Sequence, residues 1–391
     1  MPGPKTFMLI AGEPSGDLLA SELVLALRAR WPDAKFFGAG GANMAKAGVD
    51  LAFDMKDHAI VGIPTPGKIL ALRYVANELR SLAIERKPDA VIGVDYGAFN
   101  LRFGHAIKEY VLWTGATGWN PKIVQFVSPQ VWASRPGRAK LLESDYNLLL
   151  SIFPFEKAWY AQRAPKLRVE FVGHPMVDRA RSLEIGDRRS ELGGIGGKPK
   201  AGPKILLLPG SRKSELKRHV PVMIEALKLI REKMPSATAK MILPNDEIKQ
   251  LALSMSATQS DLEIQAGNLP EALAQADLAI TKTGTVTMEC AFHGVPAVTM
   301  YKKTFLGLAI ALGIVTVKSL TMPNLMAGET VYPEFIQDAA TPPNVARAAM
   351  ELLQDASRRH AMKGRLAKII ASLGEPGASR RAAEAISSLF S

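Results

Sequence analysis

Two carboxylates that follow predicted strands are the residues of this sequence best placed for acid–base chemistry. Glu13 lies in the turn AGEPSGD, after the apolar run 7–11, and Asp95 directly follows the apolar run 90–94. Because the carboxyl ends of parallel strands meet at one edge of a sheet, both carboxylates are expected at the same edge. A carboxylate there can serve as a general base. For Asp95, a role as a turn-forming residue is a comparable alternative.

The turn AGEPSGD also contains residues suited to holding a helix. Ser15 and Asp17 are expected to cap the helix that runs to Arg30, and capping alone would explain them. Glu13 is not needed for capping. Its position at the tip of the turn therefore favours a functional role.

A second group of residues could bind phosphate. In LLLPGSRKSELKRH, Pro209 and Gly210 break the strand pattern, and Ser211 and Arg212 precede a helix rich in basic residues. An arginine at such a position can form charge-assisted and often bidentate hydrogen bonds with phosphate oxygens.

The turn Thr283-Gly284-Thr285, in TKTGTVTMECAFHGVP, opens at once into a helical pattern. Exposed amides at a helix start favour anions, although threonine and glycine are also ordinary capping residues. Two such turns in one predicted domain fit a diphosphate better than a single phosphate. Glu289 lies five residues after Gly284, and its carboxylate is predicted to bind a ribose hydroxyl.

Several cofactor classes lose support from the sequence. The turn AGEPSGD lacks the Gly-Lys-Ser/Thr ending of an ATP-binding loop and the spaced glycines of a dinucleotide-binding motif, so ATP and NAD are disfavoured. His105, His174 and His219 are scattered, and no Asp-X-Asp pair is present. We therefore expect a reaction that needs neither a metal ion nor a cofactor.

The stretch SPQVWASRPGR combines an aromatic residue with basic ones. Trp132 precedes Arg135, Arg138 and Lys140, after a predicted strand. Such residues at the edge of a sheet could hold a phosphorylated acceptor or an acidic membrane. The basic cluster could equally be a solvated helix face.

An apolar stretch at 305–317 contains Phe305, Leu306 and Leu308 and is flanked by lysines. It is shorter than the ~20 residues of a membrane-spanning helix. We expect it to touch a membrane or an apolar ligand, with a buried core helix as the alternative.

Composition describes a basic globular protein. The chain has 391 residues, is 47% hydrophobic and carries a net charge of +12, which favours an anionic partner such as a nucleotide, a nucleic acid or an acidic lipid. The single cysteine, Cys290, cannot form an intrachain disulfide, which fits a reducing cytoplasm. The N-terminus lacks the apolar region of a signal peptide.

The elements that position these residues alternate in type along the whole chain, as in doubly wound parallel sheets. Short apolar runs predict strands at 7–11, 35–39, 90–94, 122–127, 147–152, 168–173, 204–209, 239–244, 277–281 and 296–300. A Gly-, Pro- and Lys-rich linker at 188–204 separates two Rossmann-like domains, at 1–187 and 205–375. Residues 376–391 form a last helix, which either packs on the N-terminal domain or is exchanged in a dimer.

Taken together, these motifs resemble those of the lipid-A-disaccharide synthases. AGEPSGD, VDYGAFN, FVSPQVWASR, FPFEK, FVGHPMVD, LLPGSRKSE, TGTVTME and MPNLMAG occur in the family's order and span essentially the whole chain. The resemblance implies a GT-B glycosyltransferase that joins UDP-2,3-diacylglucosamine to 2,3-diacylglucosamine 1-phosphate with inversion. It also implies release of UDP at the cytoplasmic face of the inner membrane and a homodimer with exchanged C-terminal segments. No nucleic acid partner is implied.

Residue roles also follow from the resemblance. Asp95 resembles the family's proposed base, Arg212 its phosphate-binding arginine and Asn324 the asparagine of its Pro-Asn-Leu segment. Glu13 and Glu289 match the glutamates of the first motif and of the Gly-Thr turn. Asn100 and Arg135 fall in the motifs assigned to acceptor binding.

The chain departs from the family pattern at three places. The loop Asp95-Tyr96-Gly97-Ala98 lacks a second carboxylate, Ser134 replaces a tryptophan, and Lys282 precedes the Gly-Thr turn. These departures leave the fold and the donor interpretation unchanged and bear on acceptor recognition and acyl preference. The rival interpretations are another GT-B enzyme of UDP-amino sugars, such as a lipid-linked cell-wall glycosyltransferase or a UDP-N-acetylglucosamine 2-epimerase, or a non-catalytic UDP-lipid-binding protein.

Overall fold

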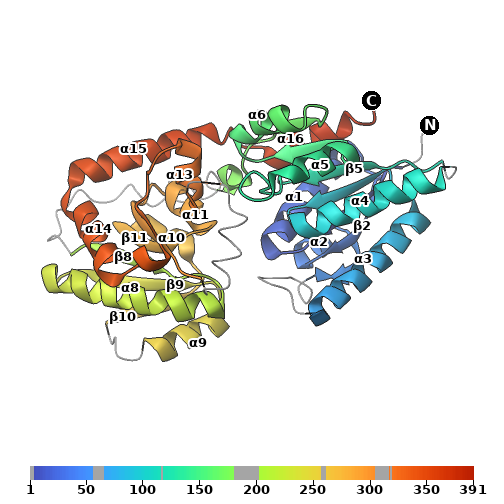
Figure 1. The fold of residues 1–391 in the computed structure, drawn as a ribbon. Coiled ribbons are helices and arrows are strands. Elements are labelled where there is room, and N and C mark those ends of the chain that lie inside the picture. The colour runs from blue at the N-terminus through green and yellow to red at the C-terminus, as the bar shows by residue number, and fades with distance from the viewer. Residues whose placement is uncertain are drawn as a thin grey trace. The chain divides into compact units, whose positions relative to one another are not determined.

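A computed structural model describes residues 4–55, 66–115, 118–179, 202–256, 261–303, 317 and 319–391. The chain divides into two compact units (Figure 1). The N-terminal unit comprises Met1–Ile185 and Leu373–Ser391, and the C-terminal unit comprises Gly186–Ser372. The last helix of the chain therefore belongs to the same unit as the first strand.

The N-terminal unit is built on a sheet of seven parallel strands in the order β3-β2-β1-β4-β5-β6-β7. The strand order reverses between β1 and β4. At such a reversal the following loops diverge and leave a ligand-binding crevice at the carboxyl ends of the strands. The bounds are β1 Thr6–Ala11, β2 Lys35–Gly40, β3 Asp50–Asp54, β4 Ala90–Val94, β5 Lys122–Phe126, β6 Leu148–Ser151 and β7 Val169–Phe171.

Helices cover this sheet, and the interior strands β1, β4 and β6 are buried along nearly their whole length. The helices are α1 Pro14–Arg30, α2 Ala42–Lys46, α3 Pro66–Arg86, α4 Gly97–Thr114, η2 Pro136–Arg138, α5 Ala139–Asp145, α6 Pro154–Arg163 and α16 Ala378–Ser387. Because both faces of these strands are covered, their sequences are nearly continuous apolar runs.

The C-terminal helix α16 packs against α1 (Figure 1). Asp178, in the motif FVGHPMVD, accepts hydrogen bonds from the backbone N–H groups of Gly377 and Ala378, which begin this helix. Arg381 donates to the carbonyl oxygen of Val172 at 2.8 Å. These contacts lie within one chain, and exchange of the segment between the chains of a dimer stays a prediction.

The C-terminal unit contains a second parallel sheet of six strands, in the order β10-β9-β8-β11-β12-β13. Here the order reverses between β8 and β11, so the loops that follow these two strands flank the reversal. The bounds are β8 Lys204–Leu208, β9 Thr238–Leu243, β10 Leu262–Ala266, β11 Leu278–Lys282, β12 Ala297–Tyr301 and β13 Glu334–Ile336.

The helices of the C-terminal unit form two groups, one on each face of its sheet (Figure 1). Helices α8, α9 and α14 make one group, and α11, α13 and α15 make the other. Their bounds, with those of α10 and η3, are α8 Lys213–Lys233, α9 Asp246–Met255, α10 Leu269–Gln275, α11 Val286–Phe292, α13 Met322–Ala327, η3 Gln337–Ala339, α14 Pro342–Gln354 and α15 Ala356–Ser372.

The predicted fold of two parallel-sheet α/β domains is confirmed. All ten predicted strands are present, and three further strands, β3, β10 and β13, were missed. The missed strands lie toward or at the edges of their sheets and contain charged or partly exposed residues, so they lack the apolar runs used for prediction.

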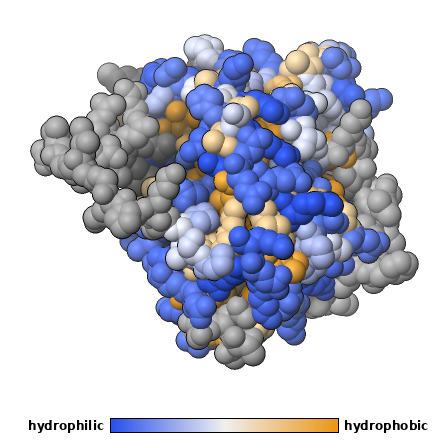
Figure 2. Space-filling view, turned by 90° about the vertical axis from the view of Figure 1, so that its left-hand side faces the viewer, coloured by the Kyte–Doolittle hydropathy of each residue, from blue (hydrophilic) through white to orange (hydrophobic). Residues whose placement is uncertain are grey.

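The molecular surface is mainly hydrophilic on the face in Figure 2, where the coloured hydrophobic residues form scattered patches. Within the described ranges, no helix is long and apolar enough to cross a membrane. The predicted apolar segment, with Phe305, Leu306 and Leu308, lies outside the described residues.

Candidate active site

The two predicted carboxylates flank the strand-order reversal of the N-terminal unit. Glu13 is the N-cap residue of α1, directly after β1, and Asp95 follows β4. Asp95 and Tyr96 both have left-handed backbone conformations, with φ of 51° and 45°. Non-glycine residues rarely adopt this conformation, so surrounding contacts must hold it.

The proton affinity of Asp95 is raised. Burial is the larger cause of its raised pKa, and the nearby negative charge of Glu13 adds to it, while a hydrogen bond from the Tyr96 backbone lowers it. A carboxylate whose pKa moves toward neutral pH is a stronger base than an ordinary aspartate. The structure therefore places Glu13 and Asp95 close enough to interact.

Two buried side-chain amides hold the backbone of Asp95. Its carbonyl oxygen accepts hydrogen bonds from Asn100 Nδ2 and Gln125 Nε2, each at 2.9 Å. Gln125 also donates to the carbonyl oxygen of Val127 at 3.1 Å, and Val127 has a positive φ of 66°. One amide therefore stabilises unusual backbone geometry at the ends of both β4 and β5.

Gly93 leaves room for these amides. A Cβ atom at Gly93 would lie 2.6 Å from Gln125 Oε1 and 2.8 Å from Asn100 Cβ.

Asn100 was assigned to acceptor binding from the sequence, and Gln125 was not identified as a site residue. The structure buries Asn100 and shows it beneath the Asp95 loop. The signal for Gln125 was a polar residue within the apolar strand KIVQF.

If Asp95 is the catalytic base, we expect Gln125→Leu to lower kcat by about 10–10²-fold, because loss of the amide donors frees the Asp95 carboxylate to leave its productive position. The KM for the donor should change little. Steady-state kinetics with both substrates measures this split, and Gln265→Leu, at a partly exposed glutamine in β10, is the matched control. An unchanged kcat in a folded Gln125→Leu variant would mean that the amide only fills the core.

Three loops meet at this edge of the N-terminal sheet. A Cβ atom at Gly12 would lie 2.3 Å from Tyr96 Cγ, so the Tyr96 ring covers the AGEPSGD turn. A Cβ atom at Gly97 would lie 2.6 Å from Pro129 Cβ, so the Asp95 loop also contacts SPQVWASR. Glycine is required at both positions because neighbouring side chains occupy the space.

The predicted cap of α1 is wrong. No side chain caps this helix, and Ser15 is exposed. Asp17 instead accepts hydrogen bonds from the backbone N–H groups of Gly41, Asn43 and Met44, at 2.7, 2.9 and 3.1 Å. It therefore fastens α1 to the start of α2, a contact that local sequence cannot reveal.

Trp132 does not occupy the exposed edge predicted for it. Its side chain is buried, and its indole Nε1 donates a hydrogen bond to Glu156 Oε1 at 2.9 Å. Burial raises the pKa of Glu156 to about 7, although several hydrogen bonds counteract this shift. Trp132 thus anchors the SPQVWASR loop to α6 from the inside.

The arginines around this loop form a positive cluster. Arg135 is exposed with a left-handed backbone at φ 61°, and Arg138 ends η2. Burial lowers the pKa of Arg138, and the charges of Arg135 and Arg102 lower it further, so the three guanidinium groups are close. Arg102 lies on α4, which packs against α5.

Across the described parts of the chain, none of these three arginines forms an ion pair with a carboxylate. Three neighbouring cations without an acidic partner favour a multivalent anion such as a phosphate group. At the SPQVWASR loop, this arginine cluster is therefore better suited to binding a phosphate group than the buried Trp132 is.

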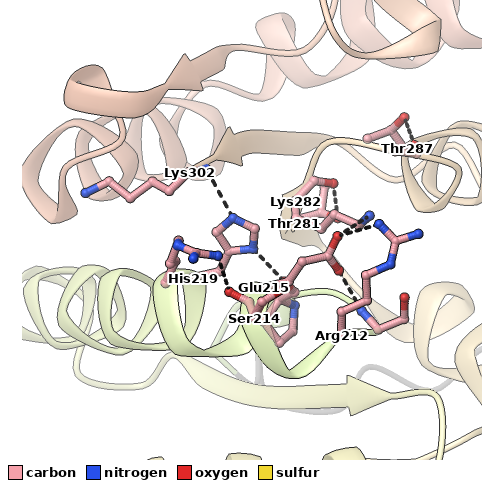
Figure 3. A network of polar contacts seen from close by, with 12 residues as sticks. Arg212, Ser214, Glu215, His219, Thr281, Lys282, Thr287 and Lys302 are labelled. Atoms are coloured by element: carbon pink, nitrogen blue, oxygen red, sulfur yellow. Dashed lines mark hydrogen bonds and ion pairs between the residues drawn. The ribbon is translucent and has the colours of Figure 1, made fainter. Parts of the chain in front are cut away.

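In the C-terminal unit, the two predicted phosphate turns are joined by a residue that sequence reasoning missed (Figure 3). Glu215 accepts a hydrogen bond from the Ser211 backbone at 3.0 Å. Its Oε1 lies 3.6 Å from Arg212 Nη1 and 3.3 Å from Lys282 Nζ. The only sequence signal was an acidic residue three positions after Arg212.

His219 fastens the first phosphate turn to the end of β12 (Figure 3). The Lys302 backbone N–H donates to Nε2 at 3.1 Å, so Nδ1 carries the proton and donates to the Pro209 carbonyl oxygen at 2.7 Å. Burial lowers the pKa of His219. The neutral imidazole is thus a structural link.

The second phosphate turn follows β11. Gly284 has a φ of 141°, which favours glycine, and its carbonyl oxygen accepts a hydrogen bond from Thr287 Oγ1 at 2.7 Å. Thr283 is buried, and Thr285 is the exposed N-cap residue of the short helix α11. Glu289 lies in the first turn of this helix and is partly exposed.

Asn324 is placed inside the C-terminal unit. Its side chain is buried and accepts hydrogen bonds from the backbone N–H groups of Val331 and Tyr332, at 2.9 and 2.8 Å. Its Nδ2 donates to the Tyr332 carbonyl oxygen at 2.9 Å. In this structure the Asn324 amide holds a loop together, and a contact between this amide and the sugar nucleotide would need another arrangement of the loop.

Among the described residues, no group of three or more His, Cys, Asp or Glu side chains is arranged so that it could hold a metal ion.

Comparison with solved structures supports the fold. The UDP-GlcNAc 2-epimerase of Neisseria meningitidis bound to UDP-GlcNAc matches with a TM-score of 0.62 at 13% identity, covering 98% of this chain and 100% of that one. The MurG structure from Acinetobacter baumannii matches with a TM-score of 0.55 at 16% identity, covering 98% and 100%. Both likenesses concern the fold alone.

Sequence comparison is more specific. A family model described as lipid-A-disaccharide synthetase matches residues 7–388. The lipid-A-disaccharide synthase of Syntrophus aciditrophicus is 34% identical over 382 residues, covering 97% of this chain and 96% of the relative. That of Trichlorobacter lovleyi is 33% identical, covering 99% and 98%. With these relatives and its GT-B fold, the chain belongs to the lipid-A-disaccharide synthase family of glycosyltransferases.

Proposed function

We propose that this enzyme transfers diacylglucosamine from UDP-2,3-diacylglucosamine to 2,3-diacylglucosamine 1-phosphate with inversion at the anomeric carbon. The products are lipid A disaccharide 1-phosphate and UDP. The observation that carries the proposal is the raised-pKa carboxylate of Asp95 at the N-terminal strand-order reversal. An inverting transfer requires one such base.

The donor would bind to the C-terminal unit. Its diphosphate is assigned to Gly210, Ser211 and Arg212 together with the turn Thr283-Gly284-Thr285, since these two loops flank the strand-order reversal. Glu289 is assigned to the ribose. The epimerase of Neisseria meningitidis, which shares the fold, is described as bound to UDP-GlcNAc. That description supports a sugar nucleotide as the ligand.

The acceptor would bind to the N-terminal unit. Its 6-hydroxyl oxygen forms a bond with the anomeric carbon of the donor, while the hydroxyl proton passes to the carboxylate of Asp95. The bond from the anomeric carbon to the UDP oxygen breaks, and its electron pair leaves with UDP. We assign the acceptor phosphate to the positive cluster of three close guanidinium groups, which belong to Arg102, Arg135 and Arg138.

Turnover of radiolabelled UDP-diacylglucosamine, with and without the acceptor, tests the proposal. We expect a disaccharide product and stoichiometric UDP only when the acceptor is present. Epimerised or hydrolysed donor without acceptor would favour an epimerase-like activity. Binding without any conversion would leave a UDP-lipid-binding protein. Either of these results would overturn the proposal.

Peripheral association with the cytoplasmic face of the inner membrane belongs to the same proposal, because both substrates carry acyl chains. The chain has a net charge of +12. Helix α3 exposes Ile69, Leu70 and Tyr74 by 38, 64 and 61%, next to the exposed Arg73. Exposed apolar side chains beside a cation suit the surface of an anionic bilayer.

We expect binding to phosphatidylcholine vesicles that contain phosphatidylglycerol, and weaker binding as salt rises. Replacing Ile69, Leu70 and Tyr74 by Ser should lower the partition coefficient by at least about tenfold, because their apolar area no longer leaves water. Vesicle flotation measures this partition, and Leu25→Ser, at a leucine that is 59% exposed on α1, is the control.

The Ser variant of Phe305, Leu306 and Leu308 tests the segment predicted from the sequence, and it too should lose vesicle binding while remaining folded. If neither triple variant weakens flotation, apolar insertion by these residues does not hold the protein at the membrane.

A further inference from the structure

Lys282 is a cation that directly precedes the second phosphate turn. It ends β11, and its side chain is only 17% exposed. Its ammonium group lies against Gly284, where a Cβ atom would come within 2.9 Å of Nζ. Lys282 therefore reaches the glycine of the turn assigned to the diphosphate.

Glu215 contacts both Lys282, at the end of β11, and Arg212, at the start of α8 (Figure 3). Its Oε1 faces both cations, at 3.3 and 3.6 Å, while its Oε2 accepts the Ser211 N–H at 3.0 Å. The Glu215 side chain is only 9% exposed. Gly210 is required beside it, since a Cβ atom there would lie 2.3 Å from Oε2.

The charges of this cluster do not cancel. Two cations share one carboxylate, which leaves one positive charge in a partly buried place. An ammonium group has three N–H donors. Among the described residues, Glu215 is the one acceptor of a hydrogen bond from the ammonium group of Lys282. Two donors of Lys282 therefore remain for an anionic ligand.

We propose that Lys282 is a second cation that binds the diphosphate, held beside Arg212 by the positioning residue Glu215. This inference rests on the donor assignment proposed above. When the bond from the anomeric carbon to the UDP oxygen breaks, negative charge grows on the terminal phosphate of UDP. Lys282 and Arg212 together neutralise that charge, from β11 and from the start of α8.

Calorimetric titration of the full chain with UDP tests the proposal. Lys282→Met should weaken UDP binding by about 10–10²-fold, the usual effect of one charge-assisted hydrogen bond. Binding of uridine, which has no phosphate, should not change. Lys282→Arg should retain most of the UDP affinity because it keeps the charge. Lys213→Met is the matched control, since Lys213 neighbours Arg212 but pairs with Glu247 at 2.7 Å.

A double variant separates direct binding from an indirect effect. Removing Lys282 alone leaves the Glu215 carboxylate less compensated, and this carboxylate could then repel phosphate. If Lys282 contacts the diphosphate, Glu215→Gln with Lys282→Met stays at least about tenfold weaker than wild type. Recovery of wild-type affinity in the double variant would overturn the proposal.

Failure of this inference can be distinguished from failure of the donor assignment. If wild type binds UDP and Arg212→Ala weakens that binding, but Lys282→Met does not, only the role of Lys282 is wrong. If wild type does not bind UDP at all, the donor assignment and the role of Lys282 are both overturned.

Discussion

Asp95→Asn should lower kcat by about 10²–10⁴-fold while the KM for the donor changes little, as expected for a lost general base. The amide preserves the size of the side chain and most of its hydrogen bonding but cannot take up the proton. The surrounding structure supports this outcome, because the Asp95 backbone is held by Asn100 and Gln125, which the substitution leaves in place. Steady-state kinetics at saturating acceptor measures the effect.

The pH dependence of kcat/KM gives an independent readout of the same base. Burial and the charge of Glu13 raise the pKa of Asp95. The base is active when deprotonated, so activity is lost as pH falls through this raised pKa. Glu13→Gln removes one of the causes, and the acidic limb should then move to lower pH, with a smaller loss of kcat than in Asp95→Asn.

The opposite ranking would contradict the assignment. If Glu13→Gln abolished turnover while Asp95→Asn stayed active, Glu13 would be the better candidate for the base. Asp95 would then be a turn residue whose left-handed backbone serves only the loop. Circular dichroism of both variants shows that any loss occurs in folded protein.

Arg212→Ala should lower kcat/KM by about 10²–10³-fold, the usual loss for one group that stabilises charge in the transition state. Arg212 is the N-cap residue of α8, and its side chain is 45% exposed although it contacts Glu215. The guanidinium group is thus anchored on one side and open to a ligand on the other. Departure of UDP is the step that needs this charge.

A neighbouring arginine is the control for this experiment. Arg218 is partly exposed on the same helix and donates to the Ser214 carbonyl oxygen at 2.7 Å. Arg218→Ala should retain near-normal kinetics. If Arg212→Ala also turns over normally, Arg212 is an ordinary surface charge and the diphosphate must bind elsewhere.

The sequence by itself determined the type and order of most elements, because apolar strands and capped or glycine-rich turns are local patterns. The turns after β1, β4, β8 and β11 could be recognised as candidate functional loops, since parallel sheets bind ligands at the carboxyl ends of their strands. Glu13, Asp95 and Arg212 were selected as candidate site residues in this way. Edge strands such as β13, whose residues are all partly exposed, lack the apolar runs used for prediction.

Only the tertiary structure decided which side chains meet. Glu215 and Lys282 are far apart in the chain, but β8 and β11 are neighbours in the sheet, so the start of α8, which follows β8, lies beside the end of β11 and the two charges come within 3.3 Å. The same reason explains why Gln125 supports Asp95, since β4 pairs with β5. Burial of Trp132 likewise depends on Glu156 in α6. Contacts of this kind depend on strand order and packing, which no local stretch of sequence encodes.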